Sequence, residues 1–447
     1  MTPLYDAISN YVNTNPLRFH MPGHKGKQII KQIDFMACDV TELPPTGNLY
    51  EAGEPFEQAQ QQWATQFQME TCQFLKGGST QGIYTAFALC TKPGDTVLID
   101  RGCHKAVYHA LALLGLEPVY LTRPWNQQWG VVDAIYPEDV ERQMQSHPEI
   151  KTVCITSPTY SGILSNITEI SHVVHRYGGR LIVDGAHGAH LPFLGLQVFE
   201  GADCLICSAH KTLPALGQAA LLFCNGIDAE TVRQTAALFG TSSPSYPILI
   251  SLDLAREWME HEGQEHYQHA KELVGKIRKK IPSIPDGDWV DPTRLTVLTR
   301  DGRALAKTLQ KDNIWPEMED CSHVIFIVTG ADTEQDLCQL EKALLKHENL
   351  FGIGTSMQPP PMPEQVMSIR DAIFASKIEL PLEQCQGKIA AGQLAPYPPG
   401  VPVVAPGERI TEKELVYFHQ IGYNNARVPV VKETSKQKME VICNSQR

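Results

Sequence analysis

The sequence has no excess of positive charge, no long apolar run and no internal repeat. Its 447 residues carry 38 Lys and Arg against 50 Asp and Glu, a formal net charge of −12, so nucleic acid is not an expected partner. Its apolar runs are far shorter than the roughly 20 residues that a transmembrane helix needs. The amino terminus contains Asp6 and no apolar stretch after a basic start, which is unlike a secretory signal. We therefore expect a cytoplasmic protein without a membrane span.

Several site motifs are also missing. Neither G-x-x-x-x-G-K-[ST] nor G-x-G-x-x-G follows any expected strand, so a P-loop or Rossmann nucleotide site is not supported. The 12 cysteines are scattered among apolar neighbours, which favours reduced thiols over a disulfide framework. The pairs His187/His190 and Cys204/Cys207 have no second ligand pair at zinc spacing, so we expect no metal.

The composition that remains is that of a globular enzyme, with 43% hydrophobic and 20% charged residues. The first sixty residues are rich in Pro, Gly and Asn and predict an arm with loops. Residues 61–282 predict a large domain, and residues 283–447 predict a smaller α+β domain after the turn-forming segment 282–287. A helix is expected over 247–281.

Helical stretches alternate with short β-branched runs in the large domain, which predicts a doubly wound α/β sheet. Runs that are apolar throughout, such as 181–183 and 204–207, are typical of parallel strands covered on both faces. In such sheets, ligands bind at the carboxyl ends of the strands. The expected strands are 96–100, 118–121, 152–156, 181–184, 203–207 and 219–224.

Two of these strands end in groups that could carry chemistry. Lys211 follows the strand 203–207 closely, and a desolvated amine is what Schiff-base chemistry requires. Asp184 ends the strand 181–184, 27 residues earlier, a spacing that permits one strand–helix–strand step. Together they could supply the Lys and Asp that pyridoxal phosphate (PLP) needs. A snorkelling lysine and a helix-capping aspartate are the structural alternatives.

A third element, Gly77-Gly-Ser-Thr80, precedes an apolar helical stretch. Backbone N–H groups at a helix start attract a phosphate, the glycines permit close approach, and the two hydroxyls add donors. The segment Ser208-Ala-His-Lys211 also matches the S-x-x-K of serine acyl-transfer enzymes, but the companion motifs S-D-N and K-T-G are missing.

These elements together resemble the Orn/Lys/Arg decarboxylases, PLP-dependent enzymes with an aspartate-aminotransferase-like fold (fold type I). The resemblance spans most of the chain. The segments that carry it are Arg18-Phe-His-Met-Pro-Gly-His-Lys-Gly26, Asp39-Val-Thr-Glu-Leu43, Gly78-Ser-Thr80, Val97-Leu-Ile-Asp-Arg-Gly-Cys-His-Lys105, Asp184-Gly-Ala-His-Gly-Ala-His190, Ser208-Ala-His-Lys-Thr-Leu-Pro-Ala-Leu216, Thr241-Ser-Ser-Pro244, Pro396-Tyr-Pro-Pro-Gly-Val-Pro402 and Pro406-Gly-Glu408.

The resemblance implies a mostly parallel, doubly wound large domain with a smaller α+β carboxyl-terminal domain. It implies that Lys211 holds PLP as an internal aldimine, that Asp184 pairs with the pyridine nitrogen, and that His104 stacks on the ring. The residues expected to hold the phosphate are Ser79, Thr80, Ser208 and His210, with Thr241 and Ser242 reaching the phosphate of the partner in a homodimer. His187 is a further cofactor-site candidate, and Lys211, His187 and His210 are the candidates to return a proton to Cα.

The chain looks like the short form of the family, because bacterial inducible members add a large amino-terminal wing domain. We therefore expect a dimer or a small multiple of dimers. The substrate is expected to be a basic L-amino acid, with arginine slightly favoured over lysine and ornithine, converted to its amine and CO2. Glu408 is the first choice to meet the distal cation, with Asp39 and Glu42 as alternatives.

Two other functions stay open from the sequence. An aminotransferase of the same fold would need an Arg to clamp the α-carboxylate, and Arg370 is available. A catalytically silent PLP-binding regulatory protein would keep the fold, although the intact set of Lys211, Asp184 and His104 argues against it.

Overall fold

The computed structural model describes residues 2–353, 359–395, 402–423 and 427–432. The chain divides into two compact units. The first contains residues 1–92, 96–101 and 119–358, and the second contains residues 93–95, 102–118 and 359–447. Within the described residues, no helix is both long enough and apolar enough to cross a bilayer.

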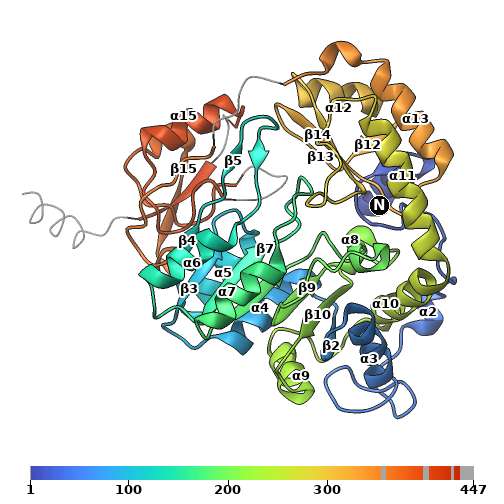
Figure 1. Ribbon diagram of the computed structural model, residues 1–447, viewed down its shortest axis with the longest axis horizontal. Coiled ribbons are helices and arrows are strands. Elements are labelled where there is room, and N and C mark those ends of the chain that lie inside the picture. The colour runs from blue at the N-terminus through green and yellow to red at the C-terminus, as the bar shows by residue number, and fades with distance from the viewer. Residues whose placement is uncertain (1, 354–358, 396–401, 424–426, 433–447) are drawn as a thin grey trace, which may run out of the picture. The chain divides into compact units, whose positions relative to one another are not determined.

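A seven-stranded sheet is the largest sheet of the described residues, and its strands are labelled in Figure 1. Its strands, in spatial order, are β2 (Thr71–Leu75), β10 (Ala220–Cys224), β9 (Cys204–Cys207), β8 (Arg180–Asp184), β7 (Thr152–Thr156), β3 (Thr96–Asp100) and β4 (Glu117–Leu121). The pairs β3/β7, β7/β8 and β8/β9 are parallel, whereas β10 is antiparallel to both β9 and β2. The predicted α/β class with a mostly parallel sheet is therefore confirmed.

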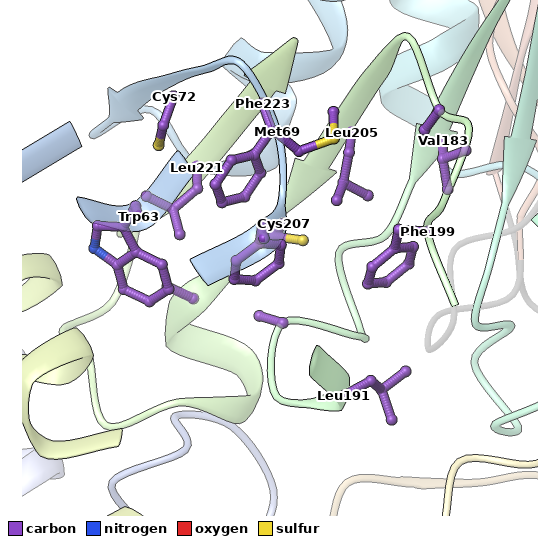
Figure 2. Close-up of a cluster of buried hydrophobic side chains, with 14 of the residues drawn as sticks. Trp63, Met69, Cys72, Val183, Leu191, Phe199, Leu205, Cys207, Leu221 and Phe223 are labelled. Carbon is purple, nitrogen blue, oxygen red and sulfur yellow. The ribbon is translucent and has the colours of Figure 1, made fainter. Parts of the chain in front are cut away.

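The strands are apolar on both faces because helices and loops cover both faces. On one face, Val183, Leu205 and Phe223 belong to a core cluster that includes Trp63 of α3 (Phe56–Phe67) and Phe199 (Figure 2). On the other face lies α4 (Gly78–Cys90), which approaches β9 closely: a Cβ built on Gly82 would lie 2.8 Å from a methyl carbon of Ile206.

The expected long helix over 247–281 is interrupted. It consists of α10 (Tyr246–Trp258), a π-helical turn (Met259–Gly263) and α11 (Gln264–Arg278). A Cβ on Gly263 would lie 2.7 Å from the Trp258 ring and from Met259 Sδ, so only glycine fits the widened turn. Periodicity alone does not distinguish such a turn from continuous α-helix.

A second, three-stranded sheet lies within the first unit. Its strands are β11 (Arg294–Leu298), β14 (His323–Ile327) and β13 (Met318–Glu319), and it shares a separate core with α11, α12 (Gly302–Lys311) and α13 (Glu334–Leu345). The amino-terminal arm joins this layer, because β1 (Leu17–Phe19) pairs in parallel with β12 (Ile314–Pro316) and Phe19 is buried in its core.

The second unit has its own small core. It contains α5 (Lys105–Leu114), α14 (Ile369–Phe374), α15 (Glu412–Gln420) and the antiparallel pair β15 (Lys377–Pro381) and β16 (Arg427–Val431). The α-helices and strands of the first unit that have not yet been named are α1 (Pro3–Asn13), α2 (Phe35–Cys38), β5 (Trp125–Asn126), β6 (Val131–Val132), α6 (Pro137–Ser146), α7 (Ile167–Arg176), α8 (Ala209–Thr212) and α9 (Ala229–Leu238).

The two compact units divide the chain differently from the boundaries expected at residues 60 and 282. Residue 60 lies inside α3, and residue 282 lies between α11 and β11 inside the first unit. The layer of β11, β13 and β14 groups with the large sheet, because α11 continues from α10 and carries the chain from one layer to the other. The resemblance segment 396–402 lies outside the described residues except for its last residue.

Candidate active site

Lys211 lies just beyond the carboxyl end of β9. The strand ends at Cys207, Ser208 precedes the short helix α8, and Lys211 N donates to Ser208 O at 3.1 Å. Burial lowers the pKa of Lys211, and the charge of Arg294 lowers it further, whereas the carboxylate of Asp184 opposes both. A lowered pKa increases the share of the neutral amine, which is the nucleophilic form.

Asp184 is the last residue of β8, the strand next to β9. It is paired in register with Ile206 of β9 and is 3% exposed. Its Oδ1 accepts from Ala186 N at 3.2 Å. Burial raises the pKa of Asp184 and the charge of Lys211 lowers it, so the two groups are close enough for their charges to act on each other. The structure thus brings the predicted acid and amine together at one edge of the sheet.

His187 lies between Lys211 and Arg294. Lys211 Nζ is 3.0 Å from His187 Nε2, and Arg294 Nη2 is 3.3 Å from His187 Nδ1. Because arginine only donates hydrogen bonds, Nδ1 must accept and carries no proton. In a neutral imidazole the ring proton is then on Nε2, the atom that lies 3.0 Å from Lys211 Nζ. Tyr160 packs edge-on against this imidazole, with ring centroids 4.9 Å apart.

One backbone hydrogen bond joins the start of α4 to the loop that contains Lys211, and a second closes that loop on itself. Gly78 N donates to Gln218 O at 3.0 Å, and His210 N donates to Ala219 O at 3.2 Å. Gly78 has φ +68°, a conformation that permits this close turn. Ser79 and Thr80 are half-buried in the first turn of α4, where backbone N–H groups lack partners within the helix. The start of α4 is therefore tied to the loop that contains Lys211, and the role of Ser79 and Thr80 toward a phosphate stays a prediction.

The hydroxyl of Ser208 provides a test of whether these residues fit PLP. Ser208 is fully buried, and its Oγ has no hydrogen-bond partner within the described protein atoms. An orphaned buried hydroxyl is unfavourable unless a ligand pairs with it. With an amine of lowered pKa at Lys211 and a buried carboxylate at Asp184, the donor set matches what PLP requires.

His210 takes a defined tautomer. Its Nδ1 lies 3.0 Å from the carbonyl oxygen of Ala219, which can only accept, so Nδ1 carries the proton. Burial lowers the pKa of His210 and favours this neutral form.

Other predicted site residues are placed elsewhere in the chain. His104 is in the second unit, where it caps α5 and its Nδ1 accepts from Ala106 N at 3.2 Å. Thr241 is half-buried and Ser242 is exposed in the loop after α9. Their roles toward the cofactor stay predictions.

The expected substrate carboxylates differ in their surroundings. Glu408, in the second unit, is 1% exposed, and its Oε2 accepts from Ala405 N at 2.7 Å. Asp39 is exposed beyond the end of α2, and Glu42 Oε2 accepts from Thr41 Oγ1 at 2.6 Å. Contact with a substrate cation stays a prediction for all three.

Sequence reasoning did not find Arg294 or Glu317. Arg294 begins β11 and reaches His187, while Glu317 accepts from Tyr160 Oη at 2.5 Å and from Met21 N at 2.9 Å. Arg294 stands at the amino end of its strand, opposite to the carboxyl ends at which site residues were sought. Glu317 is the single residue between β12 and β13, and no sequence signal marked it.

The parallel sheet, the reversed strand β10, and the Lys211–Asp184 pair at the strand ends define a PLP-dependent enzyme of the aspartate-aminotransferase fold. The chain belongs to the Orn/Lys/Arg decarboxylase family: the family's major domain matches residues 2–329, and its C-terminal domain matches residues 355–434. It is accordingly a PLP-dependent amino-acid decarboxylase.

Characterised relatives agree with this assignment. The chain is 28% identical to the arginine decarboxylase of Bacillus subtilis, over 93% of each chain. It is 23% identical to the inducible lysine decarboxylase of Escherichia coli, over 92% of this chain and 76% of that one. Among solved structures, lysine decarboxylase A of Pseudomonas aeruginosa superposes with a TM-score of 0.77 at 18% identity, covering 89% of this chain and 74% of that one. The last comparison supports the fold alone.

Proposed function

We propose that the enzyme decarboxylates a basic L-amino acid to the corresponding amine and CO2, with arginine favoured and lysine or ornithine next. The observation that carries this order is the higher identity to an arginine decarboxylase, 28%, than to a lysine decarboxylase, 23%. A cytoplasmic homodimer with shared sites is part of the same proposal.

PLP supplies the electron sink for the pair of electrons that the Cα–carboxylate bond releases. Asp184 contributes a buried carboxylate at the end of β8, and beside bound PLP it would raise the pKa of the pyridine nitrogen and so keep a proton on it. Lys211 contributes an amine whose pKa burial lowers, so a larger share of it is neutral than in a free lysine. The sheet edge keeps both groups away from bulk water, which strengthens their electrostatic effect.

The proton that returns to Cα has two sources favoured by the hydrogen bonds. His187 presents Nε2–H toward Lys211 at 3.0 Å, so it is placed to donate directly or to reprotonate the amine. His210 uses its ring proton on the Ala219 carbonyl, which makes it the weaker candidate. The proton donor is therefore His187 or Lys211.

The sequence argument for transamination depended on Arg370, whose guanidinium is engaged elsewhere. Arg370 Nη1 donates to the carbonyl oxygens of Ala112 and Leu113, at 2.7 and 3.1 Å, within the second unit. A guanidinium engaged with a helix carboxyl end in this way serves as a structural cap.

The test is an absorbance spectrum of the purified protein followed by CO2 release from arginine, lysine and ornithine in parallel. The expected result is a visible cofactor band, absent in Lys211→Ala, and CO2 from arginine first. CO2 from lysine or ornithine alone would reassign the substrate. A band with no CO2 from any of the three would overturn the proposed function.

A further inference from the structure

The amino-terminal arm contacts the turn that contains Lys211. Gly23 N donates to the carbonyl oxygen of His210 at 2.8 Å. This contact leaves no room for a side chain, because a Cβ built on Gly23 would lie 2.5 Å from Leu213 O and 2.8 Å from Leu213 N. The glycine therefore permits two backbones to lie against each other. Its N–H binds the residue that directly precedes the lysine.

The turn that contains Lys211 depends on partners from outside. α8 has four residues, and a helix of a single turn is not stable by itself, because it fixes several backbone dihedrals for very few internal hydrogen bonds. Two of its carbonyl groups accept from other parts of the chain, that of His210 from Gly23 N and that of Thr212 from the hydroxyl of Tyr267. The position of Lys211 therefore depends on what holds α8 in place.

The arm reaches Lys211 by a second route, through a carboxylate. Met21 N donates to Glu317 Oε2 at 2.9 Å, and Tyr160 Oη donates to Glu317 Oε1 at 2.5 Å. The Tyr160 ring packs edge-on against the imidazole of His187, whose Nε2 is 3.0 Å from Lys211 Nζ. Two backbone donors that are two residues apart in the chain thus support both the lysine turn and the imidazole beside the amine.

The second sheet holds the arm in turn. Thr329 Oγ1 donates to the carbonyl oxygen of Gly23 at 2.8 Å, and Lys25 Nζ donates to that of Ile327 at 2.8 Å. Lys25 Nζ also closes the arm on itself, through the carbonyl oxygen of His20 at 2.9 Å. Because Thr329, Gly23 and Lys25 are buried, these hydrogen bonds are shielded from water. The arm is therefore a firm connection between the second sheet and α8.

We propose that residues 21–23 position the reacting lysine. The N–H of Gly23 fixes the turn that contains Lys211. The N–H of Met21 fixes the imidazole of His187 through the carboxylate and the phenol ring that lie between them. Both are positioning residues, since they act through the groups that they hold. The inference rests on the proposed role of Lys211 and does not depend on which amino acid is decarboxylated.

Gly23→Ala tests the first contact in PLP-loaded enzyme. The added Cβ must push the arm away from α8, and a displacement of about 1 Å at a reacting group can cost about 100-fold in rate. We expect kcat to fall about 10- to 100-fold and KM to change less than about 3-fold, because the displaced group is the lysine and not a substrate-binding residue.

Gly302→Ala is the matched control. Gly302 is buried at the start of α12, and an added Cβ would overlap the carbonyl oxygens of His323 and Asp320, so the substitution crowds the backbone as strongly. It should lower the thermal stability as Gly23→Ala does but leave kcat close to that of the wild type.

The protonation of Lys211 gives a readout that a general loss of stability does not change. The titratable and charged groups around its amine are Asp184, His187, His210, Arg294 and Glu317. Burial has the largest effect, and it lowers the pKa of Lys211. If the turn moves toward water, the pKa returns toward 10.5. The pH midpoint of PLP capture by cofactor-free protein should therefore rise in Gly23→Ala and keep its wild-type value in Gly302→Ala.

Tyr160→Phe tests the second contact, because it removes the donor to Glu317 and keeps the ring against His187. We expect kcat to fall about 3- to 10-fold. In Gly23→Ala the displaced arm already releases Glu317, so adding Tyr160→Phe should lower kcat by no more than about 2-fold further. If the two effects multiplied in full, the contacts would be independent, and the proposal of one positioning segment would be wrong.

Thr329 offers a pair of variants in case Gly23→Ala does not fold. Thr329→Val removes the hydroxyl that holds the carbonyl of Gly23 and keeps the shape, whereas Thr329→Ser keeps the hydroxyl. Thr329→Val should raise the midpoint of PLP capture and lower kcat about 3- to 10-fold, and Thr329→Ser should keep both close to the wild type. A wild-type midpoint in Gly23→Ala, or in Thr329→Val where the first variant does not fold, would overturn the proposal even if kcat fell.

These outcomes are separate from those of the proposed function. If no basic amino acid releases CO2, the midpoint of PLP capture still decides whether residues 21–23 position Lys211. If CO2 is released and Gly23→Ala matches Gly302→Ala in midpoint and in kcat, the decarboxylation proposal stands and the positioning segment is refuted.

Discussion

The amine of Lys211 is surrounded by groups that act on its protonation in opposite directions. Burial and Arg294 lower its pKa from the ordinary 10.5, and Asp184 raises it, with a net lowering. The neutral amine is therefore present at a lower pH than in a free lysine. In cofactor-free protein, the rate of PLP capture should rise with pH around a midpoint below 10.5. Recovery of the visible band after PLP addition measures this rate.

Nα-acetyl-lysine provides the control for this titration, because its side chain has no buried surroundings. A midpoint for the protein equal to that of the control would contradict the prediction, since the pocket would then leave the amine unperturbed.

Asp184→Asn replaces the carboxylate with a neutral group of the same shape. We expect kcat to fall by about 100-fold or more, because preorganised charge at a reacting group is usually the largest catalytic contribution. PLP should stay bound through Lys211, and its visible band measures this. Asp228→Asn is the matched control, because Asp228 caps α9 on the surface and asparagine caps equally well. A kcat close to that of the wild type in Asp184→Asn would remove Asp184 from the mechanism.

At the scale of single residues, the sequence predicted the groups that end strands and missed those brought in by the second sheet. Lys211 and Asp184 could be found because a polar side chain directly after an apolar strand stands out. The contact of Arg294 with His187 spans 107 positions and depends on how the two layers pack. A pattern of neighbouring residues cannot reveal a contact between positions so far apart in the sequence.

Among the elements, α4 depends on a glycine that permits close contact with the sheet. A Cβ on Gly82 would lie 2.8 Å from both Ile206 Cγ2 and Leu75 Cδ1. Gly82→Ala should therefore lower the free energy of unfolding by about 1 to 3 kcal/mol. Because α4 would shift outward together with Ser79 and Thr80, PLP affinity should fall as well. Denaturant unfolding and PLP titration measure the two effects.

Gly275→Ala is the matched control for this substitution. Gly275 is also inside a helix, α11, but its added Cβ would meet only Asp286 Oδ2, at 3.3 Å. Helix propensity then predicts a gain of up to about 1 kcal/mol. If both substitutions changed stability alike, close packing of α4 would not be the reason for Gly82.

The amino-terminal arm is held to the second sheet by a buried lysine. Lys25 Nζ donates to the carbonyl oxygens of His20 and Ile327 at 2.9 and 2.8 Å. Burial lowers its pKa to about 8, and burial raises the pKa of Asp332, with which it interacts, to about 6. Lys25→Met should cost about 3 kcal/mol at neutral pH, because Asp332 loses its compensating cation.

The pH dependence of this loss has a defined sign. Without Lys25, the pKa of Asp332 in the folded protein should rise above 6, further from its ordinary value of 3.8. A carboxyl group whose pKa is raised in the folded state contributes stability at low pH, and this contribution is lost as the pH rises through the folded-state pKa. The loss of stability in Lys25→Met should therefore grow above pH 6. Lys27→Met, which removes a more exposed partner of Asp336, should cost less than about 1 kcal/mol. Thermal unfolding at pH 5 and pH 8 compares the variants. A loss of stability in Lys25→Met that becomes smaller as the pH rises would contradict the interaction of Lys25 with Asp332.

At the scale of elements, the six strands expected in the large domain are all present, with boundaries within one residue. They could be predicted because strands that are covered on both faces are runs of apolar residues. The sequence could not predict that β10 runs antiparallel to β9, because a run of apolar residues fits either strand direction. The π-helical turn between α10 and α11 could not be predicted either, because it shifts the helical periodicity without changing the type of residue.

For the whole molecule, shared active sites predict that two inactive variants complement each other. Lys211→Ala removes the reacting amine, and a Thr241→Ala/Ser242→Ala double variant removes the groups expected to reach the partner's phosphate. Random pairing of the two chains should restore about a quarter of the wild-type sites, because half of the dimers are mixed and each has one intact site. Co-expression with two different affinity tags measures this. No recovery in isolated mixed dimers would place all phosphate donors on one chain.

The division of the whole chain was the hardest feature to predict. The turn at 282–287 separates two sheets but not the two compact units, because contacts over α11 keep both sheets in one unit. Segments 93–95 and 102–118 join the carboxyl-terminal residues instead. A unit assembled from distant pieces of chain has no boundary that composition can show.

The reversal of β10 also bears on how this scaffold tolerates change. Because β9 and β10 are antiparallel neighbours, residues 208–219 return directly along the same edge and need no crossover helix. That short return contains Lys211 and, at Gln218, the carbonyl that anchors the start of α4. An insertion there would shift the reacting lysine and the phosphate site out of alignment together, whereas a longer crossover between parallel strands would leave both in place. For loop grafting or lineage-specific insertions, this hairpin is the segment whose length the enzyme must conserve.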